Sequence, residues 1–402
     1  MAATNQQVPP AARSTGFPNP TELRPGESLS PSRGSVHHRG MIMTRSLSAL
    51  WLWTVAALAQ PAQPGAATPA NIVLANGKIE LTIGAMGGRF SRLLLREGEP
   101  LSPLATLGHF LALDGFGAPS DEERAAGMPF HGEVGRIPAK VIAKQESGSA
   151  RSVTLQFWLP LAQETLTRTV EMAEGESIVY VTSELESAMA VDRPVSWAEH
   201  ATLGAPFLEP GKVTIDTSAT RCRVRAEKAG STGKLAYLKD FDWPMAPLTK
   251  GGFVNLLPVP VVEPSLDLAT CLMDPARRYA YVTALRADKH LIFGYVFRRE
   301  EYPWLMNWMN YSGTARATRG IEFSTQPFDV SHRETVDAHE MFGAPTYKWL
   351  PAKSKLRTRF LFFYSAVPSD FTAVSDVLFE DGQVKIKDQS GKIVALNARL
   401  PL

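Results

Sequence analysis

Alternation of apolar and polar side chains at every second position is the feature of this sequence that most restricts its fold. Residues 153–159 place Val, Leu, Phe and Leu at alternate positions, and residues 165–172 repeat the pattern. A period of two is typical of a strand that buries one face and exposes the other. The turn sequence 174–176, Glu-Gly-Glu, leads from the second run into the apolar run 178–185. We therefore predict a β-hairpin at this point.

Similar short runs recur along the rest of the chain, at residues 79–83, 139–143, 279–285, 291–297 and 356–364. Only residues 371–379 have helical spacing, with Ser369 as candidate N-cap and Gly382 beyond the end, so we predict one helix there. With 402 residues, 44% of them hydrophobic, the chain can bury a large core. No linker interrupts residues 71–395. These observations predict one all-β domain, a large antiparallel β-sandwich with very little helix.

The N-terminal part has a different character. Residues 1–40 are rich in Pro, Ser, Arg and Gly without periodicity, as in a disordered leader or an over-extended translation start. Residues 41–59 combine a basic start, an apolar run and small residues before the cleavage position, the pattern of a secretory signal peptide. Residues 60–70 form a Pro/Ala/Gly linker, which disfavours the alternative of a buried core helix at 47–58. We expect a mature protein that begins near Gln60 and is periplasmic or secreted.

Charge and motifs exclude several classes of function. The 42 basic and 40 acidic residues nearly balance, so nucleic acid and a membrane surface are not expected partners of the mature protein. Phosphate-binding glycine loops and the Gly-x-Ser-x-Gly nucleophile motif are absent from the sequence, and no metal-ligand motif occurs. We expect no cofactor and no metal. Cys222 and Cys271 allow one disulfide at most, and free buried thiols are the alternative. The sequence does not indicate an oligomeric state.

Acid/base catalysis is a class of function that these observations do not exclude. His131 lies in the motif Pro-Phe-His-Gly-Glu, His200 follows Glu199, and Glu322 lies in the run 319–326. Opening a pyranose ring requires one group that takes the proton of the anomeric hydroxyl and another that protonates the ring oxygen. A carboxylate and a histidine suit these two tasks near neutral pH. We therefore select His200, Glu322 and His131 as candidate catalytic residues of a small-molecule sugar enzyme.

Period two also assigns faces within these runs. Glu322, Ser324 and Gln326 fall on one face of their strand, whereas Glu199 and His200 fall on opposite faces of theirs, so one of the latter two is structural. Each of these candidate residues can also have a purely structural role. His131 and His200 can be histidines that bond to backbone or core groups, and Glu322 can be a surface carboxylate paired with a nearby arginine.

Further residues are candidates for binding the sugar. The run 302–308 is rich in aromatic residues, and either Trp304 or Trp308 can stack on the apolar face of a sugar. Core packing is the commoner role of tryptophan. Asp242 and Trp243 lie in a polar loop that can reach sugar hydroxyls. We select Asp242, Trp243, Trp304 and Gln326 as candidate substrate-binding residues.

The order of these motifs resembles the aldose 1-epimerase (galactose mutarotase) superfamily. The resemblance rests on four segments, Asn-Gly-Lys-Ile-Glu-Leu at 76–81 followed by Gly87-Gly88, His131-Gly132, Glu199-His200 with Gly204 and Phe207, and Glu322 within 320–326. It implies the family's β-supersandwich fold over most of residues 71–365. It also implies that His200 is the general acid to the ring oxygen, Glu322 the general base at the anomeric hydroxyl, and His131 a histidine that holds the sugar near that oxygen.

The chain departs from the family pattern at two points. Typical members have Asn-His where this sequence has Glu199-His200, and a second glycine where it has Glu133. We therefore place it in a divergent branch. Two other functions stay open: a carbohydrate-binding protein without catalysis, and a glycoside-cleaving enzyme that would use Glu199 as a second carboxylate beside Glu322.

Overall fold

The computed structural model describes residues 70–402 apart from 229–230, 261–263 and 312–316. These residues belong to one compact unit, Ala66–Leu402. The predicted leader (1–40), the signal peptide (41–59) and nearly all of the linker (60–70) lie outside the described residues.

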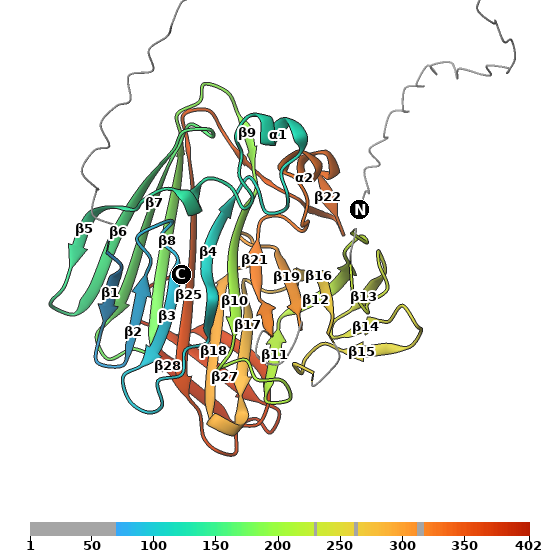
Figure 1. Ribbon diagram of the computed structural model, residues 1–402. Helices are drawn as coiled ribbons and strands as arrows, with labels where there is room; N and C mark the ends of the chain where they lie inside the picture. The colour runs from blue at the N-terminus through green and yellow to red at the C-terminus, as the bar shows by residue number, and fades with distance from the viewer. Residues whose placement is uncertain (1–69, 229–230, 261–263, 312–316) are drawn as a thin grey trace, which may run out of the picture. The chain divides into compact units, whose positions relative to one another are not determined.

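The larger of the two main antiparallel sheets carries the candidate site (Figure 1). Strand β21 (Glu322–Ser324) lies between β10 and β19 and pairs with both. The other strands, in spatial order, are β1 (Ile72–Ala75), β2 (Ile79–Ile83), β3 (Phe90–Leu95), β4 (Leu104–Leu113), β10 (Trp197–Gly204), β20 (Thr318–Gly320), β19 (Trp304–Asn310), β16 (Leu266–Met273), β12 (Ala219–Val224) and β13 (Asp240–Asp242).

The second sheet contains the predicted hairpin. Strands β7 and β8 are joined through residues 174–177 and pair in register from Glu164↔Ser187 to Glu171↔Tyr180, which confirms the hairpin. In spatial order the strands are β11 (Val213–Thr217), β17 (Tyr279–Arg286), β18 (Leu291–Arg298), β25 (Lys355–Ala366), β8 (Ile178–Ser187), β7 (Glu164–Ala173), β6 (Ala150–Leu159) and β5 (Lys140–Gln145).

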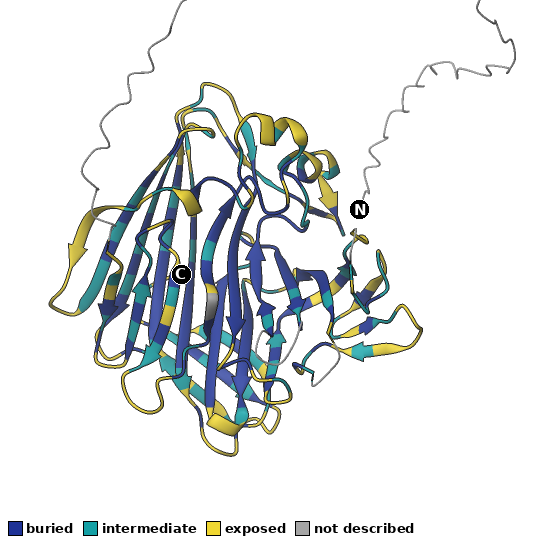
Figure 2. Cartoon of the chain, in the orientation of Figure 1, coloured by how far each residue is buried: buried dark blue, intermediate teal, exposed yellow. Residues whose placement is uncertain are grey.

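The core lies between the two sheets. On β6 the alternating side chains Val153, Leu155, Phe157 and Leu159 are each at most 1% exposed and belong to the main hydrophobic cluster. Figure 2 shows the buried residues along the central strands of both sheets, whereas β5 at the sheet edge is exposed throughout. The alternation thus produces the predicted all-β antiparallel sandwich, because the apolar half of strands such as β6 and β7 faces the opposite sheet.

The predicted helix at 371–379 is wrong. Residues Val374–Glu380 form strand β26, which pairs with β27 (Gln383–Asp388), and β28 (Ile393–Asn397) completes a three-stranded sheet. Asp381 and Gly382, both at positive φ, form the two-residue loop that joins β26 to β27. An Asp-Gly pair is a strong hairpin signal, because both positions need a left-handed backbone.

This small sheet covers apolar side chains on the outer face of the second sheet. Val377 and Ile386 pack in one cluster with Tyr281, Val296 and Phe363. Val374 and Val377 are thus buried against the second sheet, and this packing favours a strand over a helix.

The remaining elements are short. Figure 1 shows α1 and α2 at one end of the sandwich. They are α1 (Asp121–Ala125), α2 (His332–Ala338), the 3₁₀ turns η1 (Val134–Arg136) and η2 (Ala287–Lys289), and the strand pairs β14 (Met245–Pro247) with β15 (Phe253–Asn255), β22 (Glu340–Met341) with β23 (Ala344–Pro345), and β9 (Arg193–Val195) with β24 (Lys348–Leu350). Neither α-helix within the described residues has the length and apolar character needed to span a bilayer.

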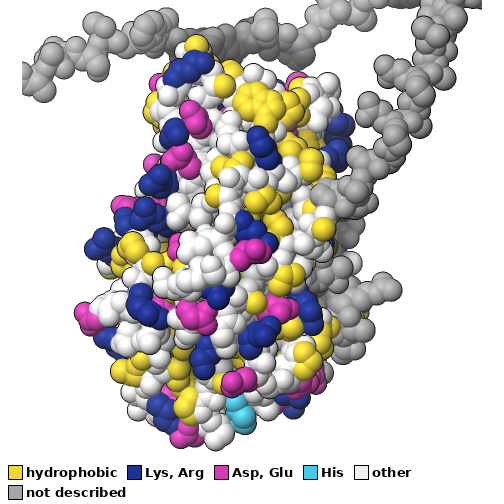
Figure 3. All heavy atoms as spheres, turned by 90° about the vertical axis from the view of Figure 1, so that its left-hand side faces the viewer, with side chains coloured by type: hydrophobic (Ala, Val, Ile, Leu, Met, Phe, Trp, Pro, Cys, Tyr) yellow, Lys and Arg dark blue, Asp and Glu magenta, His cyan; other side chains and the backbone are white. Residues whose placement is uncertain are grey.

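Cys222 on β12 and Cys271 on β16 are cross-strand partners and form a disulfide, which decides between the two open possibilities. Figure 3 shows one face of the molecule, on which acidic and basic side chains intermingle without a patch of one sign.

Candidate acid/base site

His200 and Glu322 are brought together by strand pairing in the larger sheet. Strand β21 pairs with β10 through Ala198↔Ser324 and Glu199↔Phe323, and this register continues to place His200 opposite Glu322. The Nε2 atom of His200 lies 3.5 Å from the Oε1 atom of Glu322. Side chains opposite each other on one face of an antiparallel pair are neighbours, so the register itself produces the contact.

Glu199 points to the other face of the sheet, into the core. Its carboxylate accepts hydrogen bonds from Arg168 at 2.8 and 3.2 Å and from Trp197 Nε1 at 3.1 Å, and lies 2.8 Å from His109 Nε2. Burial alone would raise the pKa of Glu199, but the Arg168 charge and His109 hold it at about 2. Glu199 is therefore a structural anion. The glycoside-cleaving hypothesis loses its second carboxylate, because Glu199 and Glu322 lie on opposite faces.

His131 reaches the same place from the segment between β4 and η1. This segment folds back over the end of β4, where a side chain at Gly132 would collide with the carbonyl oxygen of Leu113. His131 itself has φ 65°, a left-handed backbone that non-glycine residues rarely adopt. Its ring centroid lies 5.1 Å from those of His200 and Phe110.

These three residues line one cavity of about 400 Å³. Its polar side chains are His131, His200, Glu322 and Asp329. Its apolar walls are formed by Leu107, Phe110, Phe116, Phe130, Leu268 and Trp308. Ligand sites typically combine such apolar walls with a few convergent polar groups.

The Glu322 carboxyl group is buried without a hydrogen-bond partner. Its side chain is 0% exposed, and neither oxygen has a hydrogen bond within the described part of the chain. The Nδ1 atom of His131 is likewise buried and unsatisfied there. Buried polar groups are normally hydrogen-bonded, so these atoms are suited to a polar ligand in the cavity.

Burial also sets the charge of the site. Desolvation, with a smaller contribution from the Asp329 charge, raises the pKa of Glu322 well above its usual range. Desolvation lowers the pKa of His200 well below its usual range, and that of His131 to about 4. Both shifts favour the uncharged forms, a protonated Glu322 beside a neutral His200. The pair shares one proton, which is what an acid and a base working together require.

The four predicted sugar-binding residues do not line this cavity. Trp304 is fully buried, donates from Nε1 to the Pro345 carbonyl and packs beside Leu272, so a stacking role for it is wrong. Gln326 is 1% exposed, and its amide oxygen accepts a hydrogen bond from the Phe328 backbone.

Asp242 and Trp243 lie at the far edge of the sheet. Asp242 ends β13 and is exposed, and Trp243 packs against the main core. Neither residue lies near the cavity, because β16 and β12 separate β13 from the strands that carry His200 and Glu322.

Sequence reasoning missed other residues of the cavity wall. Trp308, weighed against Trp304, is the tryptophan that reaches the cavity, and its position opposite Leu268 on β16 explains why. Asp329 gave no sequence signal. It binds Arg225 at 3.3 Å and Lys228 at 2.8 Å, which fixes its carboxylate at the cavity edge.

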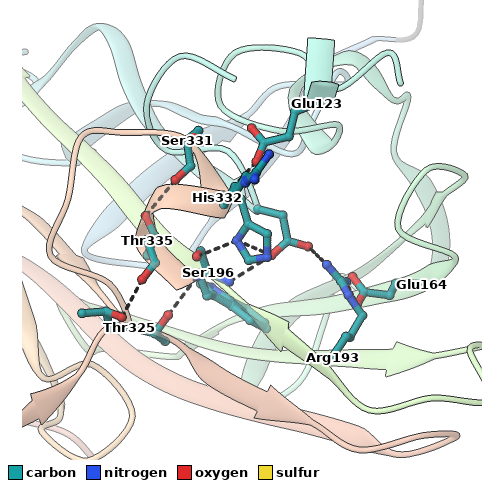
Figure 4. Close-up of polar contacts among 12 residues, drawn as sticks. Glu123, Glu164, Arg193, Ser196, Thr325, Ser331, His332 and Thr335 are labelled. Carbon is teal, nitrogen blue, oxygen red and sulfur yellow. Dashed lines mark hydrogen bonds and ion pairs between the residues drawn. The ribbon is translucent and has the colours of Figure 1, made fainter. Parts of the chain in front are cut away.

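A polar network anchors the chain segments around the cavity (Figure 4). Ser196 Oγ lies 2.9 Å from His332 Nδ1, and Arg193 bridges Glu164 and Asp114. Asp114 begins the segment that carries His131, and its carboxylate accepts a hydrogen bond from the Ser196 backbone at 2.9 Å.

The two helices belong to the same network. Glu123 of α1 accepts a hydrogen bond from the backbone of Arg333 in α2 at 2.8 Å. The segment that leads to His131 and the segment that follows Asp329 are thereby tied to one end of β10.

Similar solved structures share the fold. A galactose mutarotase-like protein from Clostridium acetobutylicum superposes with a TM-score of 0.53 at 13% identity, over 74% of this chain and 95% of that one. A galactose mutarotase related enzyme from Lactobacillus acidophilus gives 0.52 at 10% identity, over 74% and 98%. A protein from Synechocystis gives 0.52 at 14% identity, over 74% and 96%. No protein-family model and no curated protein matches the chain. At these identities the likeness shows a galactose mutarotase-like fold.

Proposed function

We propose that this chain interconverts the α and β anomers of a free aldose by acid/base ring opening, the reaction of an aldose 1-epimerase. The observation that carries the proposal is the contact of His200 with Glu322, 3.5 Å apart on the wall of one cavity. Two of the similar structures carry galactose mutarotase in their names, and the fold is theirs.

The reaction needs one proton taken and one proton given. Glu322 accepts the proton of the anomeric hydroxyl while His200 donates a proton to the ring oxygen. The bond between the anomeric carbon and the ring oxygen breaks, and an open-chain aldehyde forms. Rotation about the adjacent carbon–carbon bond exposes the other face of the aldehyde, and reversal of both proton transfers closes the second anomer. The anomeric carbon keeps its oxidation state throughout, so the reaction needs no redox cofactor.

Binding of the sugar determines the charges of Glu322 and His200 before the ring opens. Before a sugar binds, the shared proton is favoured on Glu322, since desolvation penalises both charged forms. Sugar hydroxyls that donate hydrogen bonds to Glu322 favour its carboxylate form and lower its pKa. The proton then passes to His200, whose Nε2 is the neighbouring nitrogen. His131, with its unsatisfied Nδ1, holds the sugar near the ring oxygen.

The apolar walls supply the remaining affinity. Trp308 is half-buried and Phe130 is 54% exposed, so an aromatic side chain is available to the C–H face of a pyranose ring. We further propose that the protein acts outside the cytoplasm, on the strength of the signal-like segment 41–59. The Cys222–Cys271 disulfide supports an oxidising compartment.

Polarimetry on freshly dissolved α-glucose and α-galactose tests the proposal. Spontaneous mutarotation is slow, so the enzyme shows as a faster approach to the same final rotation. A broad panel of aldoses guards against the wrong choice of sugar. Sugar binding without acceleration of any aldose would leave a carbohydrate-binding protein in place of an enzyme.

A further inference from the structure

A second hollow of about 260 Å³ adjoins the cavity of His200 and Glu322. The two share Leu107 and Phe110 as a common wall. The second hollow is otherwise lined by Met86, Gly87, Arg89 and Gly135, none of which lines the first cavity. We refer to it below as the Arg89 hollow.

The Arg89 hollow has one apolar side and one polar side. Met86 and Leu107 are 44% and 40% exposed, so aliphatic surface is open to a ligand. Arg89 is exposed, and its guanidinium has no ion pair within the described ranges of the chain. A pyranose has the same division, with C–H groups on its faces and hydroxyl groups around its rim. Arginine N–H groups donate to such hydroxyls.

The proposed reaction fixes which end of the sugar faces this hollow. His200 donates to the ring oxygen, so the ring oxygen and the adjacent C5 lie beside His200. The His200 ring is stacked on Phe110, with centroids 4.2 Å apart. Because Phe110 also lines the Arg89 hollow, substituents on the C5 side of the ring, at C6 or C4, would enter this hollow where they pass Phe110.

We propose that the Arg89 hollow binds the second residue of a reducing oligosaccharide whose reducing-end ring occupies the catalytic cavity. The inference rests on the proposed function and adds the substrate class: a sugar chain linked through C4 or C6 of its reducing end, in preference to a free monosaccharide.

A third hollow, of about 240 Å³, adjoins the cavity on its other side through Leu268 and Asp329. Its basic side chains are already paired, Arg223 with Asp240 and both Arg225 and Lys228 with Asp329. The chain of the sugar therefore extends toward Arg89 and not toward this side.

The test compares glucose with maltose, cellobiose and isomaltose by polarimetry on the full mature protein. For at least one disaccharide we expect KM to fall by about tenfold relative to glucose, with kcat unchanged, because a second residue adds binding energy away from the reacting bond. Equal kcat/KM for glucose and all three disaccharides would overturn the proposal and leave the proposed function standing. No acceleration of any sugar would instead refute the proposed function.

A steric block identifies the hollow. The backbone of Gly135 lies outside the left-handed region, and an added Cβ would meet no atom within 4 Å, so Gly135→Trp fills open space. We expect Gly135→Trp and Arg89→Ala to remove the preference for the disaccharide while glucose turnover stays the same, which also shows that the variants fold. Ala226→Trp, in the third hollow, is the matched control and should keep the preference.

Glucuronate and glucose 6-phosphate form the opposing arm, because a free guanidinium also suits an anion. The oligosaccharide assignment would be overturned if KM is lower for these anionic monosaccharides than for glucose, if Arg89→Ala abolishes this difference, and if KM is not lower for any disaccharide. A second contradicting result is that the preference for the disaccharide over glucose persists in Gly135→Trp and Arg89→Ala and is lost in Ala226→Trp. That result would place the second sugar residue in the third hollow.

Discussion

Gly320 leaves the space that the carboxyl group of Glu322 occupies. A Cβ atom at Gly320 would collide with Oε1 of Glu322 and come within 2.8 Å of its carboxyl carbon. The two residues lie two positions apart at adjoining ends of β20 and β21, so their side chains share a face. The glycine therefore determines where the proposed base can point.

Gly320→Ala should lower kcat by roughly 10-fold to 100-fold, because it displaces the carboxyl group without changing its chemistry, and a shift of about 1 Å is costly in catalysis. The melting temperature should also fall, because the added Cβ would lie 2.9 Å from Trp308 Cβ, which cannot move aside as the end of a flexible side chain can. Polarimetry and thermal unfolding measure the two effects. Gly135→Ala, where an added Cβ meets open space, is the control on glucose. Full activity of Gly320→Ala would mean that Glu322 is not the base.

Glu322→Gln and His200→Asn should each slow mutarotation by roughly 10²-fold or more, the usual effect of losing a general acid or base. Sugar affinity, measured by calorimetry, should change far less, since the other side chains that line the cavity stay in place. Glu186→Gln and His339→Asn, at exposed positions, serve as matched controls. If all four variants turn over like the wild type, the chemistry lies elsewhere.

The pH profile of kcat/KM should be a broad plateau through neutral pH. Activity requires one proton on the His200–Glu322 pair. It is lost at low pH, when His200, whose pKa is lowered, gains a second proton, and at high pH, when Glu322, whose pKa is raised, loses its proton. Both shifts widen the active range. A narrow optimum between pH 4.5 and 6.5, where ordinary Glu and His groups titrate, would show that the pair is not coupled in this way.

Glu199→Gln should destabilise the fold by about 3 to 5 kcal/mol, the usual cost of leaving one partner of a buried ion pair alone. Arg168 is 4% exposed at the side chain and would lose its counter-charge. Urea unfolding at neutral pH measures the change, with Glu186→Gln as the exposed control. The low pKa of Glu199 means that its contribution is complete above pH 4.5 and is lost as the pH falls through about 2. Should Glu199→Gln instead abolish turnover at unchanged stability, its role is not structural.

N-terminal sequencing of the protein from its native host should begin near Gln60, because the signal-like segment 41–59 ends there. Fractionation should find the protein in the periplasm or the medium. Soluble cytoplasmic protein that still carries residues 1–59 would contradict the proposed export.

Local patterns in the sequence determined the strands and their faces. Period two identified the hairpin of β7 and β8, the sandwich fold, and the opposite directions of Glu199 and His200. It failed at residues 371–379, where Asp381-Gly382 signalled a hairpin and burial against the second sheet selected a strand over a helix. Val374 and Val377 are both buried in β26 because the pairing register shifts between Val374 and Asp376, so a spacing of three residues does not require a helix here.

Only the tertiary structure decided which strands are neighbours and what each face meets. Nothing local in β21 specifies that it pairs with β10, yet this register places Glu322 beside His200. Alternation likewise gives Trp304 and Trp308 the same face of β19. Met341 and Ala344 cover Trp304 at the start of that strand, whereas Trp308 lines the cavity. The pKa shifts follow the same rule, because desolvation depends on every segment that covers a group and not on its neighbours in sequence.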